Sequence, residues 1–481
     1  MNNRMKRRTK IIATLGPATD TPGELERMIK AGVDVVRINM SHGDPEDHQR
    51  RAAQTRQAAE QAGREVAILV DLQGPKIRIG RFKEGSVQLQ VGDTFTLDNQ
   101  LDLNAGNASE VGLTYKTLPG EVTAGDTLLL DDGRIVLVVD AVSGPKVICQ
   151  VSVGGTLSNN KGINLLGGGL SADALTDKDK QDILLAATMQ ADYLAISFPR
   201  SAEDIQLCRK LAEAAGLHAA IVSKIERAEA VSDDQTLDAI IQASDVVMIA
   251  RGDLGVEVGD ARLPELQKKI IKRARQLNRV SITATQMMET MIDNPIPTRA
   301  EVFDVANAVM DGTDAVMLSG ETATGRFPEK VIEAMARICQ EAEKSRTTRE
   351  SMHRIDETFV AVDETIAMAS MYAANHFDIK GIACLTESGN TPLLMSRISS
   401  AIPIFALTAH KNTCRKVCIY RGVYPSYISY TGLTDEDIRI EMIAQLTQQG
   451  LAASGDKVLL TRGINLGKLG GTSRLEIVTI P

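Results

Sequence analysis

The feature that most constrains the fold of this 481-residue chain is a series of eight short apolar segments, each followed by a helical pattern. The segments begin near residues 9, 34, 66, 192, 219, 245, 280 and 314. One strand and its crossover helix need about 30 residues, and all but one of the intervals between these starts are close to that length. The segments are apolar on both faces, as parallel strands covered by helices are. The spacing therefore predicts an α/β fold with a TIM (β/α)8 barrel.

The long interval between the third and fourth segments spans 126 residues and implies an insertion of roughly 95 residues. Inside it, alternating apolar runs such as GDTLLLDDGRIVLVV and KVICQVSVGG are separated by turn residues, which is typical of antiparallel strands. We therefore predict a small β-barrel over residues 75–170 that covers the mouth of the larger barrel as a lid. The catalytic barrel would comprise residues 1–74 and 171–345, with residues 1–8 as an N-terminal arm.

The last part of the chain is expected to form a domain of its own. The polar stretch EKSRTTRESMHRIDE, residues 343–357, interrupts the barrel pattern. The apolar runs GIACL, PIFALTAH and GDKVLLTRG then alternate again with helical patterns. Residues 346–481 should therefore be a separate α/β domain.

Composition and charge exclude several classes of protein. No run approaches the ~18 apolar residues of a membrane span, and the apolar segment after the basic start MNNRMKRRTK is too short for a secretory signal. A formal net charge of −8 argues against binding to a nucleic-acid backbone. The six cysteines show no metal-binding spacing and should be reduced thiols. We expect a soluble, cytoplasmic protein with no nucleic-acid or membrane partner.

Polar residues stand at the carboxyl ends of the expected strands, where TIM-barrel enzymes place their active sites. A spacing of two puts Arg37, Asn39 and Ser41 on one face of the second strand. The residues that end later strands are Asp71, Lys224, Glu226, Arg251, Gly252, Asp253, Thr285 and Glu321. Any one of these charges is more simply explained as a salt bridge at the barrel mouth. Gathering all of them at one rim for stability alone would cost several kcal/mol of desolvation, so we expect a functional site.

The residue types at this rim favour phosphoryl transfer assisted by a hard cation. Glu226 and Asp253 lack neighbouring histidine or cysteine ligands, which suits Mg²⁺ or Mn²⁺ and not Zn²⁺. Arg37 and Lys224 would face a phosphate. Of the six histidines only His42 falls in a rim motif, so histidine acid–base chemistry is not expected. Positioning and charge neutralisation are what phosphoryl transfer requires of a protein.

Seven motifs carry a resemblance to a known family. RINMSHG, DLQGPKIR, IVSKIERAEAV, IARGDLGVE, ATQMMETM, PTRAEV and LSGETA occur in this order. With the β-rich insertion after the third strand, they resemble the pyruvate kinase family over all 481 residues. The resemblance implies a glycolytic enzyme that transfers the phosphoryl group of phosphoenolpyruvate to ADP, which gives ATP and an enolate that is protonated to pyruvate.

The resemblance also implies roles for individual residues. Lys224 would bridge the transferring phosphoryl group and steady the enolate oxygen. Glu226 and Asp253 would hold the protein-bound Mg²⁺, and a second Mg²⁺ would arrive with ADP. The residues implied to contact the substrate are Gly252, Asp253, Lys224 and Thr285. Arg37 and Arg78 would bind phosphoryl oxygens. The residues implied to contact the nucleotide are Pro17, Arg37, Asn39, His42 and Lys161. Thr285 would lie near the carbon that is protonated.

Two other functions remain open at this point. The first is a Mg²⁺-dependent aldolase or lyase that acts on a pyruvate enolate without a nucleotide; the lid insertion and Lys161 speak against it. The second is a non-catalytic sensor of sugar phosphates. The intact set of Lys224, Glu226, Asp253 and Thr285 speaks against a silent protein.

The loop TESGNT, residues 386–391, is the candidate effector site of a regulatory C-terminal domain. It follows an expected strand and precedes a helical pattern, so it could hold a phosphate, although a simple helix cap explains it equally well. The residues expected to bind the effector are Thr386, Ser388, Gly389 and Thr391. The resemblance places an allosteric sugar-phosphate site here and implies a homotetramer. Because Glu387 and Asn390 stand where a bisphosphate site would carry basic residues, we expect activation by a sugar monophosphate or AMP.

The segment DLQGPKIR raises the question of a monovalent cation. The resemblance implies a potassium pocket formed by Asn39, Ser41, Asp71 and the carbonyl of Leu72. Potassium-dependent members carry Glu where this chain has Lys76. Two monovalent cations ~4 Å apart repel by about 4 kcal/mol at an effective dielectric constant of ~20. We therefore predict that the Lys76 ammonium pairs with Asp71 and that K⁺ is not required, the simpler alternative being that Lys76 points to solvent.

Overall fold

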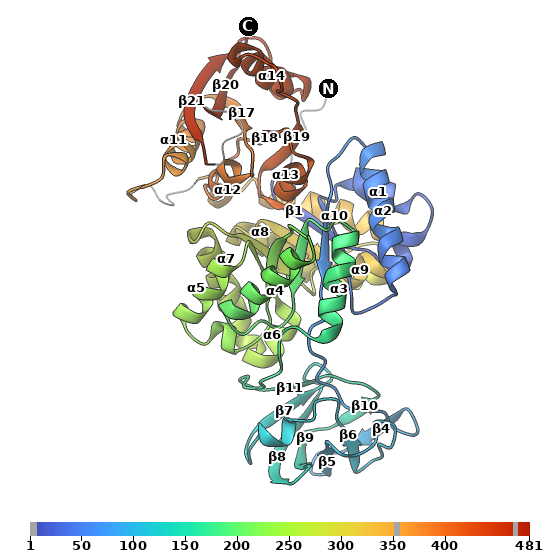
Figure 1. Cartoon of the computed structure of the whole chain (residues 1–481). Coiled ribbons are helices and arrows are strands. Elements are labelled where there is room, and N and C mark those ends of the chain that lie inside the picture. The colour runs from blue at the N-terminus through green and yellow to red at the C-terminus, as the bar shows by residue number, and fades with distance from the viewer. Residues whose placement is uncertain (1–6, 351–355, 465–469) are drawn as a thin grey trace.

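The computed structural model describes residues 7–350, 356–464 and 470–481, and it shows three parts stacked along one direction (Figure 1). A barrel lies in the middle, the β-rich insertion at one end and the C-terminal domain at the other. Within the described residues, the length and apolarity needed to span a bilayer are found in no helix.

Eight parallel strands close the central barrel, as the spacing predicted. Their spatial order is β1-β16-β15-β14-β13-β12-β3-β2. The strands are β1 (Lys10–Thr14), β2 (Val35–Asn39), β3 (Ala67–Asp71), β12 (Tyr193–Ile196), β13 (Ala220–Ile225), β14 (Val246–Ala250), β15 (Val280–Ala284) and β16 (Ala315–Leu318). The register pairs Asn39 with Asp71, so residues that end neighbouring strands meet at one rim. This confirms the predicted TIM barrel.

Helices cover the outside of the barrel and fix which strand residues face inward. They are α1 (Glu24–Ala31), α2 (Pro45–Gln61), α3 (Asp177–Thr188), α4 (Ala202–Ala214), α5 (Asp234–Ala243), α7 (Leu263–Gln276), α8 (Arg299–Asp311) and α10 (Pro328–Ala342). Capping boxes at Thr176 and Thr298 begin α3 and α8. Val36 and Ile38 pack in the core shared with the helices, whereas Val35 belongs to the barrel interior. Arg37 and Asn39 therefore continue the inner face of β2 towards the rim.

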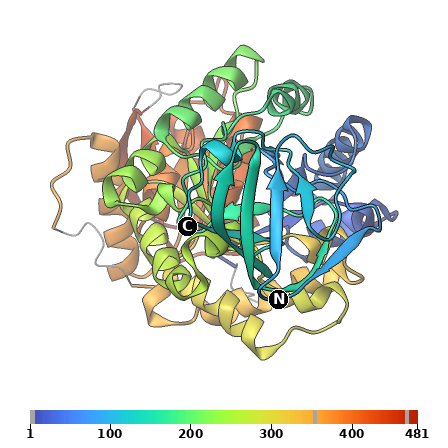
Figure 2. The ribbon, with the colours of Figure 1, turned by 90° about the horizontal axis from the view of Figure 1, so that it is seen from below.

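The insertion between β3 and α3 is a β domain with its own core around Phe95, Leu97 and Leu137. The domain contains a six-stranded sheet, ordered β11-β7-β8-β9-β5-β6, and a two-stranded sheet, β10-β4. The strands are β4 (Ser86–Leu89), β5 (Thr94–Asp98), β6 (Glu110–Gly112), β7 (Thr127–Leu130), β8 (Ile135–Ser143), β9 (Lys146–Val153), β10 (Gly155–Ser158) and β11 (Ile163–Leu165). In the view from below, this domain lies across the mouth of the barrel (Figure 2).

The C-terminal domain is an α/β domain, as predicted, and it closes the opposite end of the barrel. Its sheet is ordered β19-β18-β17-β20-β21, with β21 antiparallel. The elements are β17 (Ile379–Leu385), β18 (Ile404–Thr408), β19 (Val423–Tyr427), β20 (Lys457–Gly463), β21 (Thr472–Thr479), α11 (Val362–His376), α12 (Asn390–Ser396), α13 (Lys411–Lys416) and α14 (Asp435–Gln448). The short helix η7 (Val417–Ile419) joins the apolar cluster of the barrel interior.

Candidate active site

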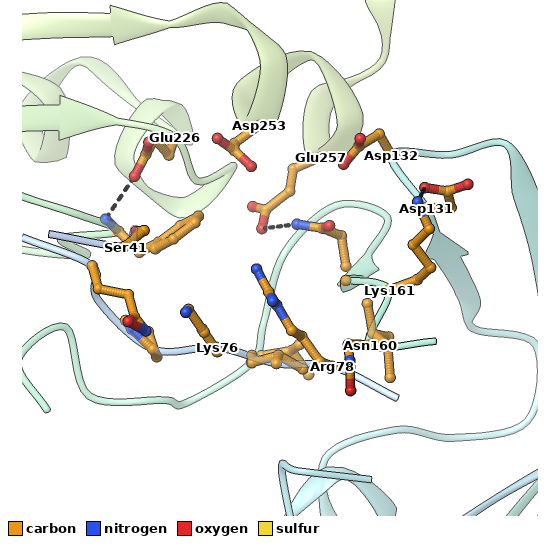
Figure 3. A pocket seen from close by; sticks show the side chains of 18 of the residues that line it. Ser41, Lys76, Arg78, Asp131, Asp132, Asn160, Lys161, Glu226, Asp253 and Glu257 are labelled. Atoms are coloured by element: carbon orange, nitrogen blue, oxygen red, sulfur yellow. Dashed lines mark hydrogen bonds and ion pairs between the residues drawn. The ribbon is translucent and has the colours of Figure 1, made fainter. Parts of the chain in front are cut away.

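A polar cavity of about 630 Å³ lies between the barrel rim and the lid (Figure 3). The barrel contributes Lys224, Glu226 and Asp253 to its lining, among others. Lys76 and Arg78 follow β3 and face these carboxylates from the other side, as Figure 3 shows. The cavity thus brings together residues that lie more than 170 positions apart in the chain.

Lys224 is the centre of the charge arrangement at the end of β13. Its Nζ lies 2.9 Å from Oε1 of Glu226 and 3.5 Å from Oδ1 of Asp71. Nζ also donates a 2.8 Å hydrogen bond to Oγ of Ser197. Burial alone would lower the pKa of Lys224, but the charges of Asp71 and Glu226 outweigh it and raise the pKa above its usual value. The ammonium is therefore charged at neutral pH and can stabilise developing negative charge.

Asp71 is buried, and its partners differ from those expected. Arg37 Nε lies 2.6 Å from Oδ2 of Asp71, and Lys224 approaches Oδ1. Burial would raise the pKa of Asp71, but Lys224 and Arg37 lower it overall. In the described part of the chain no ion pair joins Asp71 to Lys76, so the prediction of that direct pair is wrong. The reason is that Asp71 is already neutralised from within the barrel by Arg37 on β2 and Lys224 on β13.

Lys76 nevertheless lines the cavity, together with Ser41 and Arg78. Burial lowers the pKa of Lys76, and the charges of Arg78 and Lys178 lower it further. The surroundings of its ammonium are thus predominantly cationic. Ser41 donates its backbone N–H to Oδ1 of Asn39 at 3.1 Å, so these two predicted pocket residues are in contact.

Glu226 and Asp253 form an acidic pair at the ends of β13 and β14. Burial and the charge of Asp253 raise the pKa of Glu226 to about 7, although Lys224 opposes them. Burial raises the pKa of Asp253 as well. Two buried carboxylates that each favour a proton carry more negative charge than their surroundings neutralise. They fit a hard divalent cation whose other ligands are water and substrate oxygens.

Thr285 and Gly252 are joined at the rim, next to Asp253. The N–H of Gly252 donates to Oγ1 of Thr285 at 2.9 Å, and that hydroxyl donates to the carbonyl of Ala284 at 2.7 Å. Thr285 has φ 65°, in the left-handed region that residues other than glycine seldom adopt. The hydroxyl of Thr285 is therefore held in one place by a strained turn.

Arg251 and Glu321, which the sequence placed at the rim, support this turn and its neighbours. Arg251 pairs with Asp304 at 2.6 and 2.8 Å and donates to the carbonyl of Thr285 at 2.5 Å. Glu321 accepts N–H groups from Ser319 at 2.7 Å and from Met288 at 3.2 Å. Both side chains are buried. Each one holds neighbouring backbone segments in place through its hydrogen bonds.

The residues predicted to bind nucleotide are only partly brought together. Lys161 lines the cavity and pairs with Asp131, also of the lid, at 2.7 Å. Asn39 ends β2, next to Asp71. Pro17 and His42 are exposed residues that follow β1 and β2, and neither is among the residues that line the cavity.

The sequence analysis missed three residues of the site. Ser197 contacts Lys224, and Phe198 donates its N–H to Oε2 of Glu226 at 2.9 Å. Glu257, on α6 (Arg251–Val258), lines the cavity, and burial raises its pKa to about 6. Ser197 and Phe198 follow the fourth strand in SFPR, so the rule that polar residues end each strand would have found Ser197. Glu257 is the last residue of the motif IARGDLGVE, but the motif gave it no role.

The loop 386–391 forms a compact turn before α12. Gly389, with φ 82°, donates its N–H to Oγ1 of Thr386 at 3.0 Å. The hydroxyls of Thr391 and Thr472 lie 2.7 Å apart. His410 contacts Oε2 of Glu387 at 2.7 Å. Of the predicted effector residues, Ser388 lines a second cavity, of about 560 Å³, between the loop and the barrel helices.

Comparisons with known proteins agree over nearly the whole chain. Residues 6–332 match the family model described as pyruvate kinase, barrel domain, and residues 364–478 match pyruvate kinase, alpha/beta domain. The chain is 55% identical over 480 residues to pyruvate kinase II of Salmonella typhimurium, which covers 99% of this chain and 100% of that protein. It is 55% identical over 464 residues to pyruvate kinase of Haemophilus influenzae, 96% of each chain. Pyruvate kinase of Geobacillus stearothermophilus is 38% identical over 480 residues, 99% of this chain and 81% of that one.

Proposed function

The chain belongs to the pyruvate kinase family of phosphotransferases, and from this premise we propose how its own residues serve the transfer from phosphoenolpyruvate to ADP. The observation that carries the proposal is the position of Lys224, which is buried, charged and held between Asp71 and Glu226 at the mouth of the barrel. A fixed cation at this point meets the charge that develops on the transferred phosphoryl group and on the enolate oxygen.

Glu226 and Asp253 are the residues that would hold Mg²⁺, or Mn²⁺ in its place. When bound, the ion supplies charge that neutralises substrate oxygens. Arg37, which pairs with Asp71, would bind phosphoryl oxygens together with Arg78, which lines the cavity. The Thr285 hydroxyl, held by its strained turn, would lie near the carbon that receives a proton.

A coupled assay for pyruvate tests the reaction and the role of Lys224 together. With phosphoenolpyruvate, ADP and Mg²⁺ we expect ATP and pyruvate in equal amounts, and loss of at least about 100-fold in kcat for Lys224→Met. Lys180→Met is the matched control, because Lys180 is exposed and pairs with the exposed carboxylate of Asp177 at 2.8 Å. ATP formation at the unmodified rate by Lys224→Met would disprove the role. Pyruvate released without ATP would mean that the phosphoryl group goes to water, and it would contradict the proposed transfer to ADP.

Lys161 would join the site from the lid. It shares the cavity wall with Arg78, and closure of the lid would bring both towards the nucleotide while excluding water from the phosphoryl group. We expect Lys161→Met to raise KM for ADP much more than KM for phosphoenolpyruvate. Equal changes in the two constants would contradict a nucleotide contact.

We retain the proposal that K⁺ is not required, on a ground that differs from the sequence argument. Lys76 does not neutralise Asp71, but Lys76 and Arg78 make this part of the cavity cationic and so disfavour a further monovalent cation. Activity should be nearly complete when tetramethylammonium is the only monovalent cation, and Lys76→Glu should create a potassium requirement. Strong stimulation of the unmodified enzyme by KCl, beyond a matched ionic-strength control, would refute this.

Allosteric activation by a sugar monophosphate or AMP through Thr386, Ser388, Gly389 and Thr391 remains part of the proposal. Its support is the turn that these residues form and the acidic side chain of Glu387 beside it, which disfavours a second phosphate. Activation curves for glucose 6-phosphate, AMP and fructose 1,6-bisphosphate distinguish the candidates. Tighter activation by the bisphosphate than by either monophosphate would overturn the assignment.

We also propose a homotetramer. Large apolar side chains are exposed on or beside α8, where Ile296, Phe303 and Met310 have 72, 69 and 41% of their surface accessible. The edge strand β21 exposes Ile477 at 44%. Faces of this kind fit contacts between copies of the chain. Light scattering of the purified protein should give four chains, and Phe303→Glu should give smaller species.

A further inference from the structure

We propose that Ser197, at the end of β12, is a positioning residue that fixes the ammonium of Lys224, so that its hydroxyl is needed for turnover and much less for substrate binding. The inference rests on the proposed role of Lys224 and deepens it. It concerns a barrel strand for which the sequence analysis named no site residue.

The direction of the hydrogen bonds at Ser197 follows from two contacts. Oγ of Ser197 donates to the carbonyl of Leu72 at 2.7 Å, and Nζ of Lys224 lies 2.8 Å from the same oxygen. A hydroxyl has one proton and two lone pairs, and an ammonium only donates. The proton of Ser197 therefore lies towards Leu72, and a lone pair faces Lys224. Ser197 is only 1% exposed, so water does not compete at this oxygen.

Ser197 restrains a side chain that the two carboxylates alone would leave movable. Lysine carries its charge on a flexible four-carbon stem, and an ammonium between two anions can shift towards either one. Glu226 and Asp71 form ion pairs with the Lys224 ammonium at 2.9 and 3.5 Å, and Ser197 accepts a directed hydrogen bond from it at 2.8 Å. Loss of this neutral acceptor would leave the ammonium held by the two ion pairs alone. A misplacement of about 1 Å at a reacting centre costs roughly 100-fold in rate.

The next residue strengthens the argument, because the same corner also fixes a proposed metal ligand. Phe198 has φ 56°, in the left-handed region, and its N–H donates to Oε2 of Glu226 at 2.9 Å. A residue with a side chain is disfavoured there by roughly 1–2 kcal/mol. The corner of β12 thus adopts a strained backbone in which two consecutive residues contact Lys224 and Glu226.

The corner also contacts the segment through which the chain leaves the barrel for the lid. Gly74 has φ 66°, and a Cβ on it would lie 2.8 Å from Cβ of Ser197. Leu72, which accepts the Ser197 hydroxyl, belongs to the same segment. Ser197 therefore links the barrel–lid connection to Lys224 through one hydroxyl group.

Kinetics of Ser197→Ala and Ser197→Cys test the proposal, with Ser223→Ala as the matched control. Ser223 is the residue before Lys224, is fully buried, and bonds Oγ of Ser244 at 2.8 Å on the side away from the cavity. We expect Ser197→Ala to lower kcat about 100-fold, with KM for phosphoenolpyruvate changed less than about threefold. Ser223→Ala should keep kcat within about twofold, although it also removes a buried hydroxyl.

The cysteine variant and a second reaction keep the test decisive. Cysteine preserves the shape but is a weak acceptor, so its kcat should fall as well, which identifies the accepted hydrogen bond as the cause even if the alanine variant folds poorly. Exchange of pyruvate methyl protons with deuterated water, followed by NMR, should slow in both Ser197 variants, because it requires Lys224 at the enolate without phosphoryl transfer. Turnover of either variant within about threefold of the unmodified enzyme, or an equal loss in Ser223→Ala, would overturn the inference. Lack of pyruvate kinase activity in the unmodified protein would refute the proposed function instead.

Discussion

At the scale of single residues, Arg251 shows how a charge that the sequence places at the active rim can act through the backbone. Its guanidinium contacts Asp304 and the carbonyls of Ala284 and Thr285, on both sides of the peptide that turns into the left-handed region. It does not line the cavity. Its function is therefore to hold Thr285, and its effect on the reaction should be indirect.

The first prediction concerns Arg251→Met. The variant should lose about 2 kcal/mol of stability, because charge-assisted hydrogen bonds to Asp304 and two carbonyls disappear, and kcat should fall as Thr285 loses its support. Arg209→Met is the control: Arg209 pairs with Asp245 at 2.9 Å, but both side chains are about one-third exposed, so the loss should stay below about 1 kcal/mol. Denaturation midpoints and kcat give both quantities. Equal destabilisation by the two variants would contradict the assignment.

At the scale of elements, the connection from β11 back to the barrel has a backbone conformation that depends on glycine. Gly167, Gly168 and Gly169 have φ of 88°, 81° and 110°, a run of left-handed conformations that only glycine adopts readily. Glu229 accepts the N–H of Gly169 at 2.5 Å, and the carbonyl of Glu257 accepts the N–H of Gly167 at 3.0 Å. This connection is where lid movement would change backbone angles.

The second prediction compares Gly168→Ala with Gly167→Ala. Both place a side chain at positive φ and should cost about 1 kcal/mol. Only at Gly168 would the new Cβ lie 2.6 Å from the carboxylate of Glu229; at Gly167 there is nothing within 4 Å. Gly168→Ala should therefore lose more stability and accelerate hydrogen exchange at Gly169, whose N–H bonds Glu229. Equal losses of stability and equal rates of hydrogen exchange at Gly169 in the two variants would contradict this prediction.

The third prediction is a pH dependence at Glu257, which connects α6 to the lid through a 3.4 Å contact with Asn164. Burial raises its pKa to about 6 from 4.5. The folded protein then holds a proton that the unfolded chain releases, so the carboxyl destabilises the fold progressively as pH rises from about 4.5 to about 6. Glu257→Gln should be more stable above pH 6 by about 2 kcal/mol.

Urea midpoints measured from pH 4.5 to 8 test this for Glu257→Gln against Glu333→Gln, since Glu333 is exposed on α10. The difference between Glu257→Gln and the unmodified protein should grow with pH and level off above pH 6, while that of Glu333→Gln stays near zero. A difference that is constant with pH would show that Glu257 titrates normally.

The elements themselves were predictable, and the contacts between their ends were only partly so. All eight barrel strands begin within two residues of the predicted starts, because strands covered on both faces give continuous apolar runs. The residues at the rim could then be predicted as well, because parallel strands end at the same edge of the barrel. The partners of Asp71 could not be predicted in this way. Lys76 is closer in sequence, but the residue that pairs with Asp71 is Lys224, which lies 153 residues further along the chain. Such choices depend on the closed barrel and not on local pattern.

At the scale of the whole molecule, the C-terminal domain is joined to the end of the barrel opposite the active site. Apolar residues from η7 and β19 continue the barrel-interior cluster, and Lys10 Nζ donates to the carbonyl of Val423 at 2.5 Å. Arg397, which follows α12, pairs with Asp314, which precedes β16; their side chains are 2 and 3% exposed. The sequence predicted both domains but not this interface, because its charged residues lie 83 positions apart with no pattern that relates them.

The last prediction concerns this buried pair, because the effector that we propose for the C-terminal domain would act through this interface. Arg397→Met removes the ion-pair partner of buried Asp314 and leaves it the N–H groups of Ser281 and Arg421. It should therefore cost about 3 kcal/mol, whereas Arg397→Met combined with Asp314→Asn should recover much of this. Lys380→Met, which breaks an exposed pair with Asp378, should leave the stability nearly unchanged. Calorimetry should show the transition of the C-terminal domain shifted down in the single variant and partly restored in the double variant. If Arg397→Met behaves like Lys380→Met, the pair does not hold the domains together, and coupling from the proposed effector site would run through the apolar contacts of η7.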